Sequence, residues 1–190
     1  MRIEPLPRGS GFEFVDDIYG GAIPHQFVPA VEKGIREVLA AGPMAGFPVH
    51  DVRVIVYDGK HHSVDSKEIA FAIAGRKAFI DAINKARAVL LEPIVNMEVS
   101  VPESFIGAVT GDISSRRGQI TGTCGLSAGL SAVNAIAPLS ELRDYQTRLK
   151  SMTGGRGSYS IELAHYEPVP GHLQQQLVTE YKATVKIEED

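Results

Sequence analysis

Apolar and polar residues recur along the chain with two different periods. Strict alternation, which is typical of a half-buried strand, predicts strands at about 12–16 and 49–57. Apolar residues spaced three and four apart predict amphipathic helices at about 27–41 and 66–87. The proline-rich residues 1–8 are compatible with an edge strand, where a missing N–H is tolerated.

The second helix is expected to bury one apolar stripe along its length. The stripe would consist of Ile69, Ala72, Ile73, Phe79, Ile80 and Ile83. Either Asp65 or Ser66 is positioned to cap the first turn, and Glu68 stands where a capping-box partner of Asp65 would be. The polar residues before this helix are therefore expected to form a short loop between a strand and a helix.

The second half of the chain has a new and nearly symmetric pattern. Residues 88–93 indicate a short strand that ends at a proline, which is the best position for a domain boundary. The elements after it follow the order β-α-β-β-α-β, the ferredoxin-like arrangement, with Ser140 as the cap of the second helix. The expected fold class is α+β with two domains, at 1–90 and 91–170, followed by a tail at 171–190.

The composition indicates a globular protein whose overall charge does not favour binding to nucleic acid. The chain has 190 residues, of which 44% are hydrophobic and 22% charged, and its net charge is −4. Any contact with nucleic acid must therefore be local. Cys124 is the single cysteine, so no internal disulfide forms. No apolar run reaches the roughly 20 residues of a membrane span, and no signal-peptide pattern is seen, so we expect a cytoplasmic protein.

The sequence contains no recognisable catalytic motif. It has neither a P-loop nor a G-x-S-x-G nucleophile elbow. Cys124 lies in a strand-like run, where a buried and inert thiol is expected. His61 and His62 are adjacent on an extended segment, so they point to opposite sides and would not easily share a metal ion. We expect no cofactor or metal, although pattern alone leaves a metal site, a solvated loop and a contact loop open for these histidines.

Arg116 and Arg117 lie at the predicted end of a helix, and they have two interpretations. Cations there complement the helix dipole, which is a structural role. Alternatively, they form a small basic patch against RNA phosphates, which Arg148, Lys150 and Arg156 could enlarge. Few aromatic residues accompany these arginines, so stacking on single-stranded bases is not indicated there.

Six stretches of the chain can be read together. They are GGAIPHQFVPAVEKGI, DGKHHSVDSKEIAF, LLEPI, GDISSRRGQI, APLSEL and RLKSMTGGRGSYSIE. In their order and spacing they resemble the two C-terminal domains of elongation factor G, the ribosomal translocase of bacteria. The resemblance implies that residues 1–90 are most of the family's fourth domain, a β-α-β-α arrangement whose crossover is left-handed against the usual rule. Residues 91–170 would be the fifth, ferredoxin-like domain.

The resemblance also implies a role for the polar loop. In the family, tip loops of the fourth domain enter the decoding region of the small subunit and touch the codon–anticodon duplex as tRNA and mRNA advance. His62 aligns with the family's tip histidine. The candidate RNA contacts of this loop are Lys60, His61, His62, Ser63 and Asp65.

For the second domain the resemblance implies a contact with the large subunit. In the family this domain lies near the GTPase-associated region, which makes Arg116, Arg117 and Arg156 candidate rRNA contacts. The expected partners are thus the ribosome, with its rRNA, ribosomal proteins and bound tRNA–mRNA duplex. Neither DNA nor a membrane is expected as a partner.

Departures from the family pattern limit what the 190 residues do alone. The GTPase, second and third domains are missing, so GTP and Mg²⁺ would bind in a longer parent and the fragment itself would not be an enzyme. The family's other tip segment, upstream of residue 1, is also missing, and with it the first strand of the fourth-domain sheet. Lys60, His61 and Ser63 differ from the family's common residues. The parent would be a translocase, or a paralogue that protects or recycles ribosomes. A metallohydrolase using the loop histidines and an interaction module without RNA contact are the other hypotheses.

Overall fold

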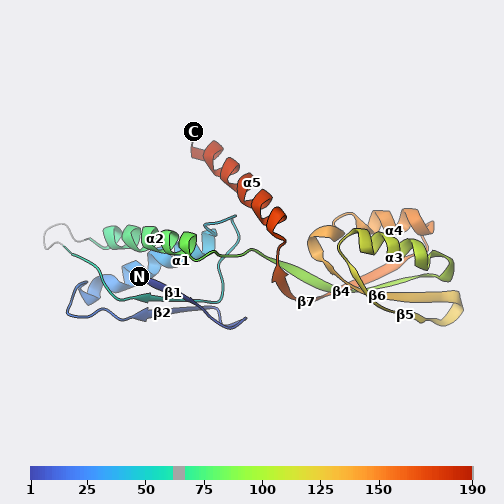
Figure 1. Cartoon of the computed structure of the whole chain (residues 1–190), viewed down its shortest axis with the longest axis horizontal. Helices are drawn as coiled ribbons and strands as arrows, with labels where there is room; N and C mark the ends of the chain where they lie inside the picture. Colours follow the sequence, from blue (N-terminus) through green and yellow to red (C-terminus); the bar gives the residue numbers. More distant parts are fainter. Residues whose placement is uncertain (62–66, 190) are drawn as a thin grey trace. The chain divides into compact units, whose positions relative to one another are not determined.

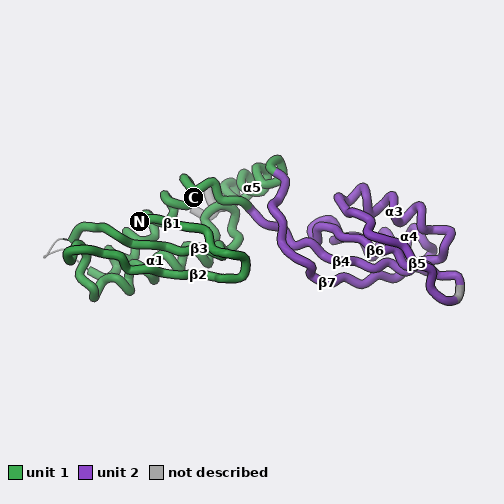
Figure 2. Tube along the Cα trace, turned by 60° about the horizontal axis from the view of Figure 1, so that its bottom comes forward, with its two compact units in different colours: residues 1–89, 171–190 green, residues 90–170 purple. Residues whose placement is uncertain are grey.

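Each half of the chain builds its own sheet. The computed structural model describes residues 1–61 and 67–189. These form two compact units, unit 1 of residues 1–89 with 171–190 and unit 2 of residues 90–170 (Figure 2). The predicted fold class, α+β with two separate sheets, is confirmed.

The elements follow one another as labelled in Figure 1. Unit 1 contains β1 (Arg2–Pro5), β2 (Phe12–Asp16), η1 (His25–Phe27), α1 (Val28–Ala41), β3 (Val52–Val56), α2 (Glu68–Lys85) and α5 (Gly171–Glu189). Unit 2 contains β4 (Leu91–Pro102), η2 (Glu103–Phe105), α3 (Ile106–Ser115), β5 (Gln119–Gly125), η3 (Ser127–Gly129), β6 (Leu130–Pro138), η4 (Leu139–Leu142), α4 (Tyr145–Thr153) and β7 (Ser158–Pro168).

Unit 1 is a three-stranded sheet with α1 and α2 packed on one face (Figure 1). The strand order is β1-β3-β2, and β3 is antiparallel to β1 but parallel to β2. Two parallel strands must be joined by a crossover connection, and here α1 forms the crossover from β2 to β3. The three elements make up the βαβ unit that was expected. The hand of this crossover stays a prediction. Alternate residues of β3, Val52, Val54 and Val56, lie in the core with the apolar faces of both helices.

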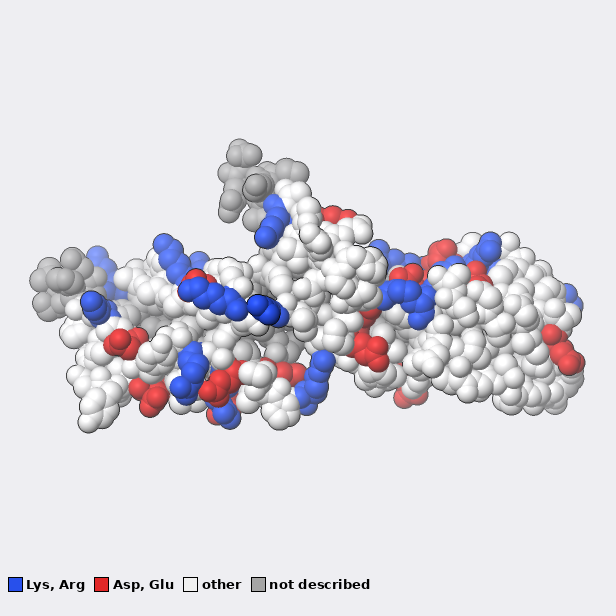
Figure 3. Space-filling model, viewed as in Figure 1, with Lys and Arg blue, Asp and Glu red and all other residues white. Residues whose placement is uncertain are grey.

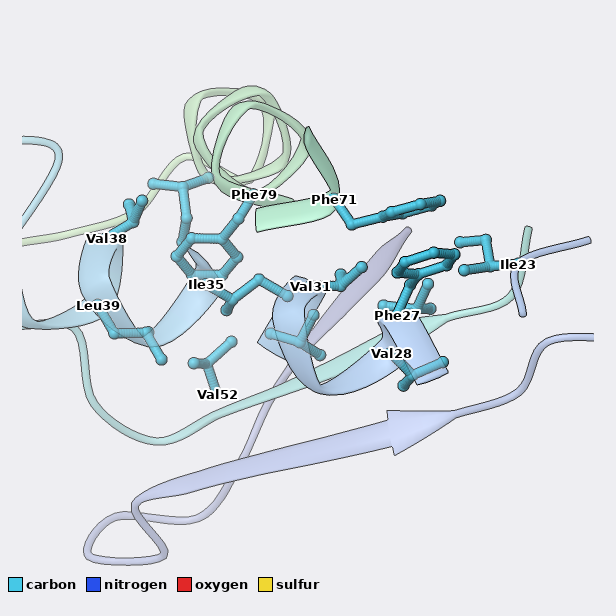
Figure 4. Packing of buried hydrophobic residues seen from close by; sticks show 13 residues of the cluster. Ile23, Phe27, Val28, Val31, Ile35, Val38, Leu39, Val52, Phe71 and Phe79 are labelled. Carbon is cyan, nitrogen blue, oxygen red and sulfur yellow. The ribbon is translucent and has the colours of Figure 1, made fainter. Parts of the chain in front are cut away.

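The two helices of unit 1 approach each other backbone to backbone. A Cβ added at Gly34 would collide with the carbonyl oxygen of Ala72, and one added at Gly75 would lie 2.7 Å from the carbonyl oxygen of Val31. Glycine is needed at both positions because any larger residue would push the helices apart. Beside this contact the ring of Phe79 is fully buried (Figure 4).

The buried face of α2 differs from the predicted stripe. Its buried residues are Phe71, Gly75, Phe79 and Ile83, spaced four apart. Ile69 and Ile73 were predicted to be buried, but they are 68% and 42% exposed. The prediction was wrong because it placed the isoleucines on the buried face of α2. The close contact with α1 instead buries the face that carries Gly75.

The start of α2 also differs from the prediction. The helix begins at Glu68, and Lys67 is its N-cap without a side-chain capping hydrogen bond. A capping box between Asp65 and Glu68 requires Asp65 itself to be the N-cap, so that prediction was wrong. Asp65 and Ser66 lie outside the described residues.

Unit 2 has the ferredoxin-like fold that the pattern predicted. Its strand order is β5-β6-β4-β7, with every neighbouring pair antiparallel. Its first and third strands, β4 and β6, are therefore central, as the split βαβ arrangement requires. The helices α3 and α4 lie over one face of the sheet (Figure 1). The core beneath them includes Val99, Val109, Val133 and Tyr145, all fully buried.

The first strand of unit 2 is longer than predicted. Rather than a short strand at 88–93 followed by another, β4 runs unbroken from Leu91 to Pro102. Pro93 is accommodated because this end of β4 pairs with β7 alone, while pairing with β6 starts at Ile94. Proline is tolerated where one side of a strand has no ladder to complete.

Two further side chains of unit 2 differ from expectation. Ser140 does not cap α4, whose N-cap is Asp144. Instead, the Ser140 hydroxyl donates to Glu92 Oε2 at 3.3 Å. Cys124 is exposed rather than buried, and it lies on β5, which is an edge strand of the sheet.

The last residues of the chain form a helix, α5, where the sequence analysis expected a tail. Within unit 1 the Tyr181 ring of α5 lies against Gly46, where an added Cβ would be 2.9 Å from the ring. The helix was missed because its apolar residues form only a weak stripe, so packing rather than periodicity decides its place.

Candidate functional site

Two loops meet at one end of unit 1. In the parallel pair of β2 and β3, Asp16 lies beside Val56, so both strands end at the same edge of the sheet. The loops that follow, residues 17–24 and 57–61, are therefore neighbours (Figure 1), and we call them the tip loops. The edge beyond the carboxyl ends of parallel strands is a common location for binding sites.

The tip loops are held to each other by direct contacts. His61 Nδ1 lies 3.3 Å from the carbonyl oxygen of Ala22. A carbonyl can only accept, so the ring must carry its proton on Nδ1 to bond there. Gly59 packs so closely on Ile23 that an added Cβ would lie 2.6 Å from Ile23 Cγ1. The Gly59 N–H also donates to Asp58 Oδ1 at 2.8 Å, which shapes the start of the second loop.

A buried apolar cluster supports the tip loops. Ile23 and Phe27 come from the segment between β2 and α1, and Phe71 comes from the first turn of α2 (Figure 4). The rings of Phe27 and Phe71 are stacked, with centroids 4.5 Å apart and an interplanar angle of 13°. All three side chains are at least nine-tenths buried. The exposed loops therefore stand on a well-packed base.

The structure places part of the predicted RNA-contacting loop at this end. Lys60 and His61 are exposed on the second tip loop. His62, Ser63 and Asp65 lie outside the described residues. Within residues 1–61 and 67–189, no group of three or more His, Cys, Asp or Glu side chains is arranged to hold a metal ion. What the described part of the loop offers is a set of outward polar groups.

The first tip loop was not recognised from the sequence. Its Tyr19 is 93% exposed, and Gly20 and Gly21 follow it with φ angles of +66° and +70°. His25, just after the loop, is exposed and its Nδ1 lies 3.4 Å from Asp16 Oδ2. The Gly-Gly pair signals a turn, but the strand pairing that brings this loop beside His61 is long-range and leaves no local signature.

Arg116 is enclosed by acceptors at the end of α3. Its Nε donates to Asp112 at 2.8 Å, and its Nη1 donates to Asp144 Oδ1 at 2.6 Å and to the Glu141 carbonyl at 2.7 Å. The hydrogen bond with Asp144 is the main cause that raises the pKa of Arg116, and it lowers the pKa of Asp144 in turn. With a side chain only 14% exposed, Arg116 offers little to an RNA phosphate.

Arg117 forms a bidentate pair with Glu92 of β4. The two N–O distances are 2.7 and 2.8 Å, and Arg117 Nε also donates to Glu141 Oε1 at 2.9 Å. Glu92 is buried, and the hydrogen bonds from Arg117 hold its pKa below the usual value. These contacts favour the structural interpretation of the arginine pair over an RNA-contacting one. We call Arg116, Arg117 and their carboxylate partners the arginine cluster.

Arg156 has a different environment from the other two predicted arginines. Its Nε donates to the Thr153 carbonyl at 3.3 Å, and its guanidinium carbon lies 5.0 Å from the centroid of the Phe105 ring. The residue is exposed, and no ion pair holds it in the part of the chain that the structure describes. Of the three, Arg156 is the arginine that remains accessible to an anionic partner.

The face of the described residues that is drawn in Figure 3 has no broad basic patch. On the side drawn in Figure 3, Lys and Arg are interspersed with Asp and Glu over both units. This agrees with the net charge of −4, so that any contact with a nucleic acid would have to be local. Among the described helices, none combines the length and the apolar character that crossing a membrane requires.

Comparisons with known proteins agree on one family. The family model described as "Elongation factor G, domain IV" matches residues 1–87, and that described as "Elongation factor G C-terminus" matches residues 89–177. Elongation factor G of Aquifex pyrophilus is 50% identical over 183 residues, which are 96% of this chain and 26% of that protein. An elongation factor G-like protein of Thermotoga maritima is 46% identical over 189 residues, 100% of this chain and 28% of that protein.

A solved structure shares the fold as well as the sequence. A crystal structure of a protein from Thermus thermophilus superposes with a TM-score of 0.75 at 41% identity, covering 95% of this chain and 27% of that one. The chain thus spans only about a quarter of the length of these relatives.

Proposed function

We propose that this chain, which belongs to the elongation factor G family, is the ribosome-contacting C-terminal part of a translational GTPase that moves tRNA and mRNA. The observation that carries the proposal is the succession of the domain IV match and the C-terminus match along almost the whole chain. Two relatives with elongation factor G in their names support it by matching 96% and 100% of the chain. Such a factor would work in the cytoplasm, where the ribosomes are.

The tip of unit 1 would enter the decoding region. Lys60, His61, His62 and Ser63 would donate hydrogen bonds to phosphates, and Asp65 would accept from 2′-hydroxyls, in both cases without reading sequence. Such contacts suit a factor that must act on every codon. The packed cluster of Ile23, Phe27 and Phe71 would keep the loops in shape while they displace RNA.

Unit 2 would contact rRNA of the large subunit through Arg156. Its exposed guanidinium can pair with a phosphate at no cost to the fold. Arg116 and Arg117 would first have to give up Asp112, Asp144 and Glu92, so their part in an rRNA contact is the weaker half of this proposal.

GTP and Mg²⁺ would be bound by another domain of the full-length factor. The 190 residues contain no P-loop, so they cannot cradle the phosphates themselves. Hydrolysis in that domain would drive the tip forward. A gene whose coding sequence upstream of Met1 lacked a P-loop would contradict this arrangement.

The test of the tip is His62→Ala in the full-length factor, with His50→Ala as the matched control. His50 is exposed at the opposite end of β3, so its loss should change nothing. Losing a hydrogen bond to RNA at position 62 should slow single-round translocation about fivefold to tenfold. A His62→Ala rate equal to wild type would remove the assigned role of this residue.

A paralogue with a specialised task is the second candidate. It is favoured by the match of the whole chain to an elongation factor G-like protein. A factor of this kind would split or protect ribosomes rather than translocate. Comparing translocation with subunit splitting and with rescue of drug-stalled ribosomes, for the same full-length protein, decides between the two.

A further inference from the structure

We propose that Tyr19 is a direct RNA contact of the tip, which stacks its ring on an exposed nucleobase. The inference rests on the proposed function, because it takes RNA as the surface that the tip meets. It goes further by assigning a binding role to the first tip loop, which lies outside the polar loop of the sequence motif. The ligand class is a base at the edge or end of an RNA duplex.

Tyr19 is displayed by a loop that is fixed on both sides. Before it, the Asp17 N–H donates to the Val56 carbonyl at 2.9 Å, and the Ile18 N–H donates to Asp16 Oδ1 at 3.1 Å. After it, Ile23 is buried at 6% exposure in the cluster with Phe27. The Tyr19 ring is 93% exposed, so little protein contact would have to be broken before it binds a partner. Because the backbone on both sides is already fixed, binding would cost little conformational entropy of the chain.

The backbone beside Tyr19 is open to a close approach. Gly20 and Gly21 follow it directly, and a Cβ built at either one would meet no atom within 4 Å. Their positive φ angles explain why glycine occurs there. The missing side chains also leave room for a flat partner to lie against the tyrosine ring.

The second tip loop is close enough to share one ligand. Ala22, three residues after Tyr19, bonds to His61 at 3.3 Å. Three residues of chain span at most about 11 Å, so an RNA segment that contacts Tyr19 would also be within reach of the His61 loop.

Local charge favours a base over a phosphate as the partner of this loop. Asp16 and Asp17 precede Tyr19, and Asp58 stands on the neighbouring loop. Against them the described tip loops carry Lys60 and His61, and His25 follows directly after the first loop. The carboxylates beside Tyr19 disfavour a phosphate at this one position, whereas a tyrosine ring stacks on the uncharged face of a base.

The experiment compares three single variants of the full-length factor in single-round translocation. Tyr19→Ala removes the ring, Tyr19→Phe keeps the ring but removes the hydroxyl, and Tyr166→Ala is the matched control. Tyr166 is an exposed tyrosine, 51% accessible, on β7 of unit 2. Tyr19→Ala should slow translocation about tenfold, as expected for the loss of one base–aromatic stack. Tyr19→Phe and Tyr166→Ala should retain the wild-type rate, and ribosome-stimulated GTP hydrolysis should be unchanged in all three.

The outcomes separate this inference from the function on which it rests. A wild-type rate for Tyr19→Ala, in a factor that translocates and depends on His62, would overturn the stacking role and leave the proposed function in place. Equal loss in Tyr19→Ala and Tyr19→Phe would replace stacking by a hydroxyl hydrogen bond, and would overturn it too. A wild-type factor that does not translocate overturns both.

A photo-crosslink identifies the class of partner. Tyr19→p-benzoylphenylalanine, irradiated on ribosomes that carry tRNA and mRNA, should give a crosslink to RNA that ribonuclease removes. A crosslink confined to a ribosomal protein would show that the ring meets protein, and would contradict the proposal.

Discussion

The tip loops of unit 1 and the arginine cluster of unit 2 handle polar groups in opposite ways. At the tip, Tyr19, Lys60 and His61 are exposed, and the loops are fixed by hydrogen bonds between polar side chains and backbone groups and by buried apolar side chains. In the cluster, Arg116 and Arg117 turn inward onto carboxylates of β4, α3 and η4. The comparison shows that counting the charges in a segment is a poor guide to binding. What matters more is whether those charges are already paired within the protein.

The difference has a simple energetic cause. A buried carboxylate such as Glu92 must be paired, because leaving it alone costs several kcal/mol. A guanidinium that is committed to such a carboxylate is no longer available to a ligand. At the tip nothing charged is buried among the described residues, so the side chains can remain solvated until a partner arrives.

The largest effect is expected from Arg117→Ala. It leaves Glu92 buried without its bidentate partner, and should lower the free energy of unfolding by about 3 kcal/mol. The measurement is urea unfolding of the 190-residue chain, with Arg156→Ala as the matched control. The exposed Arg156 should change stability by less than about 0.5 kcal/mol. If Arg117→Ala were as stable as the wild type but bound ribosomes more weakly, Arg117 would be an RNA contact rather than a structural residue.

A smaller effect is expected from Gly59→Ala at the tip. The new methyl group would press on Ile23, whose side chain is buried, so either the loop or the cluster must shift. Overpacking of this kind should cost about 1–2 kcal/mol. The control is Gly107→Ala in α3, where an added Cβ meets nothing within 4 Å. Thermal unfolding should show a lower midpoint for Gly59→Ala alone, and an unchanged midpoint would mean that the two tip loops are not packed as described.

The smallest effect is a difference in pH dependence. Because the pKa of Glu92 is lower in the folded protein than its ordinary value of 4.5, its contribution to stability is complete above that value and is lost as the pH falls through the folded-state value. Between pH 7 and pH 3, the free energy of unfolding of Glu92→Gln should therefore fall by less than that of the wild type. Glu162→Gln, which changes an exposed residue of β7, should follow the wild-type curve. Parallel curves for wild type and Glu92→Gln would contradict the pairing with Arg117.

Much of the fold could be predicted because its signals are local. Alternation and helical spacing predicted the order of the strands and α-helices from β1 to β7, although not α5, and Gly154 ends α4 in the left-handed conformation, as a glycine stop should. The errors arose where tertiary contacts choose between similar residues. Ile69 and Ile73 were assigned to the wrong face because the glycine contact with α1 orients α2, and no pattern within one helix reveals its partner.

The candidate site was predictable only in part. A polar loop between a strand and a helix identified Lys60 and His61 as exposed, while the first tip loop depended on the parallel pairing of β2 with β3, which links residues 40 positions apart. The two arginines were correctly placed at a helix end. Their partners Glu92 and Asp144 lie 25 and 28 residues away along the chain, so the sequence could not show that the charges were already neutralised.

The backbone contact between α1 and α2 gives unit 1 a mechanical property. Both helices begin next to the tip loops, so a force on the loops would act on the first turns of α1 and α2. Where Gly34 meets Ala72 and Gly75 meets Val31, no long side chain lies between the backbones that could rotate to absorb the load. The pair can yield only by bending hydrogen-bonded helices, which close packing resists. We therefore expect unit 1 to resist bending where the two helices touch, so that a force applied at one end would be carried along the helix pair.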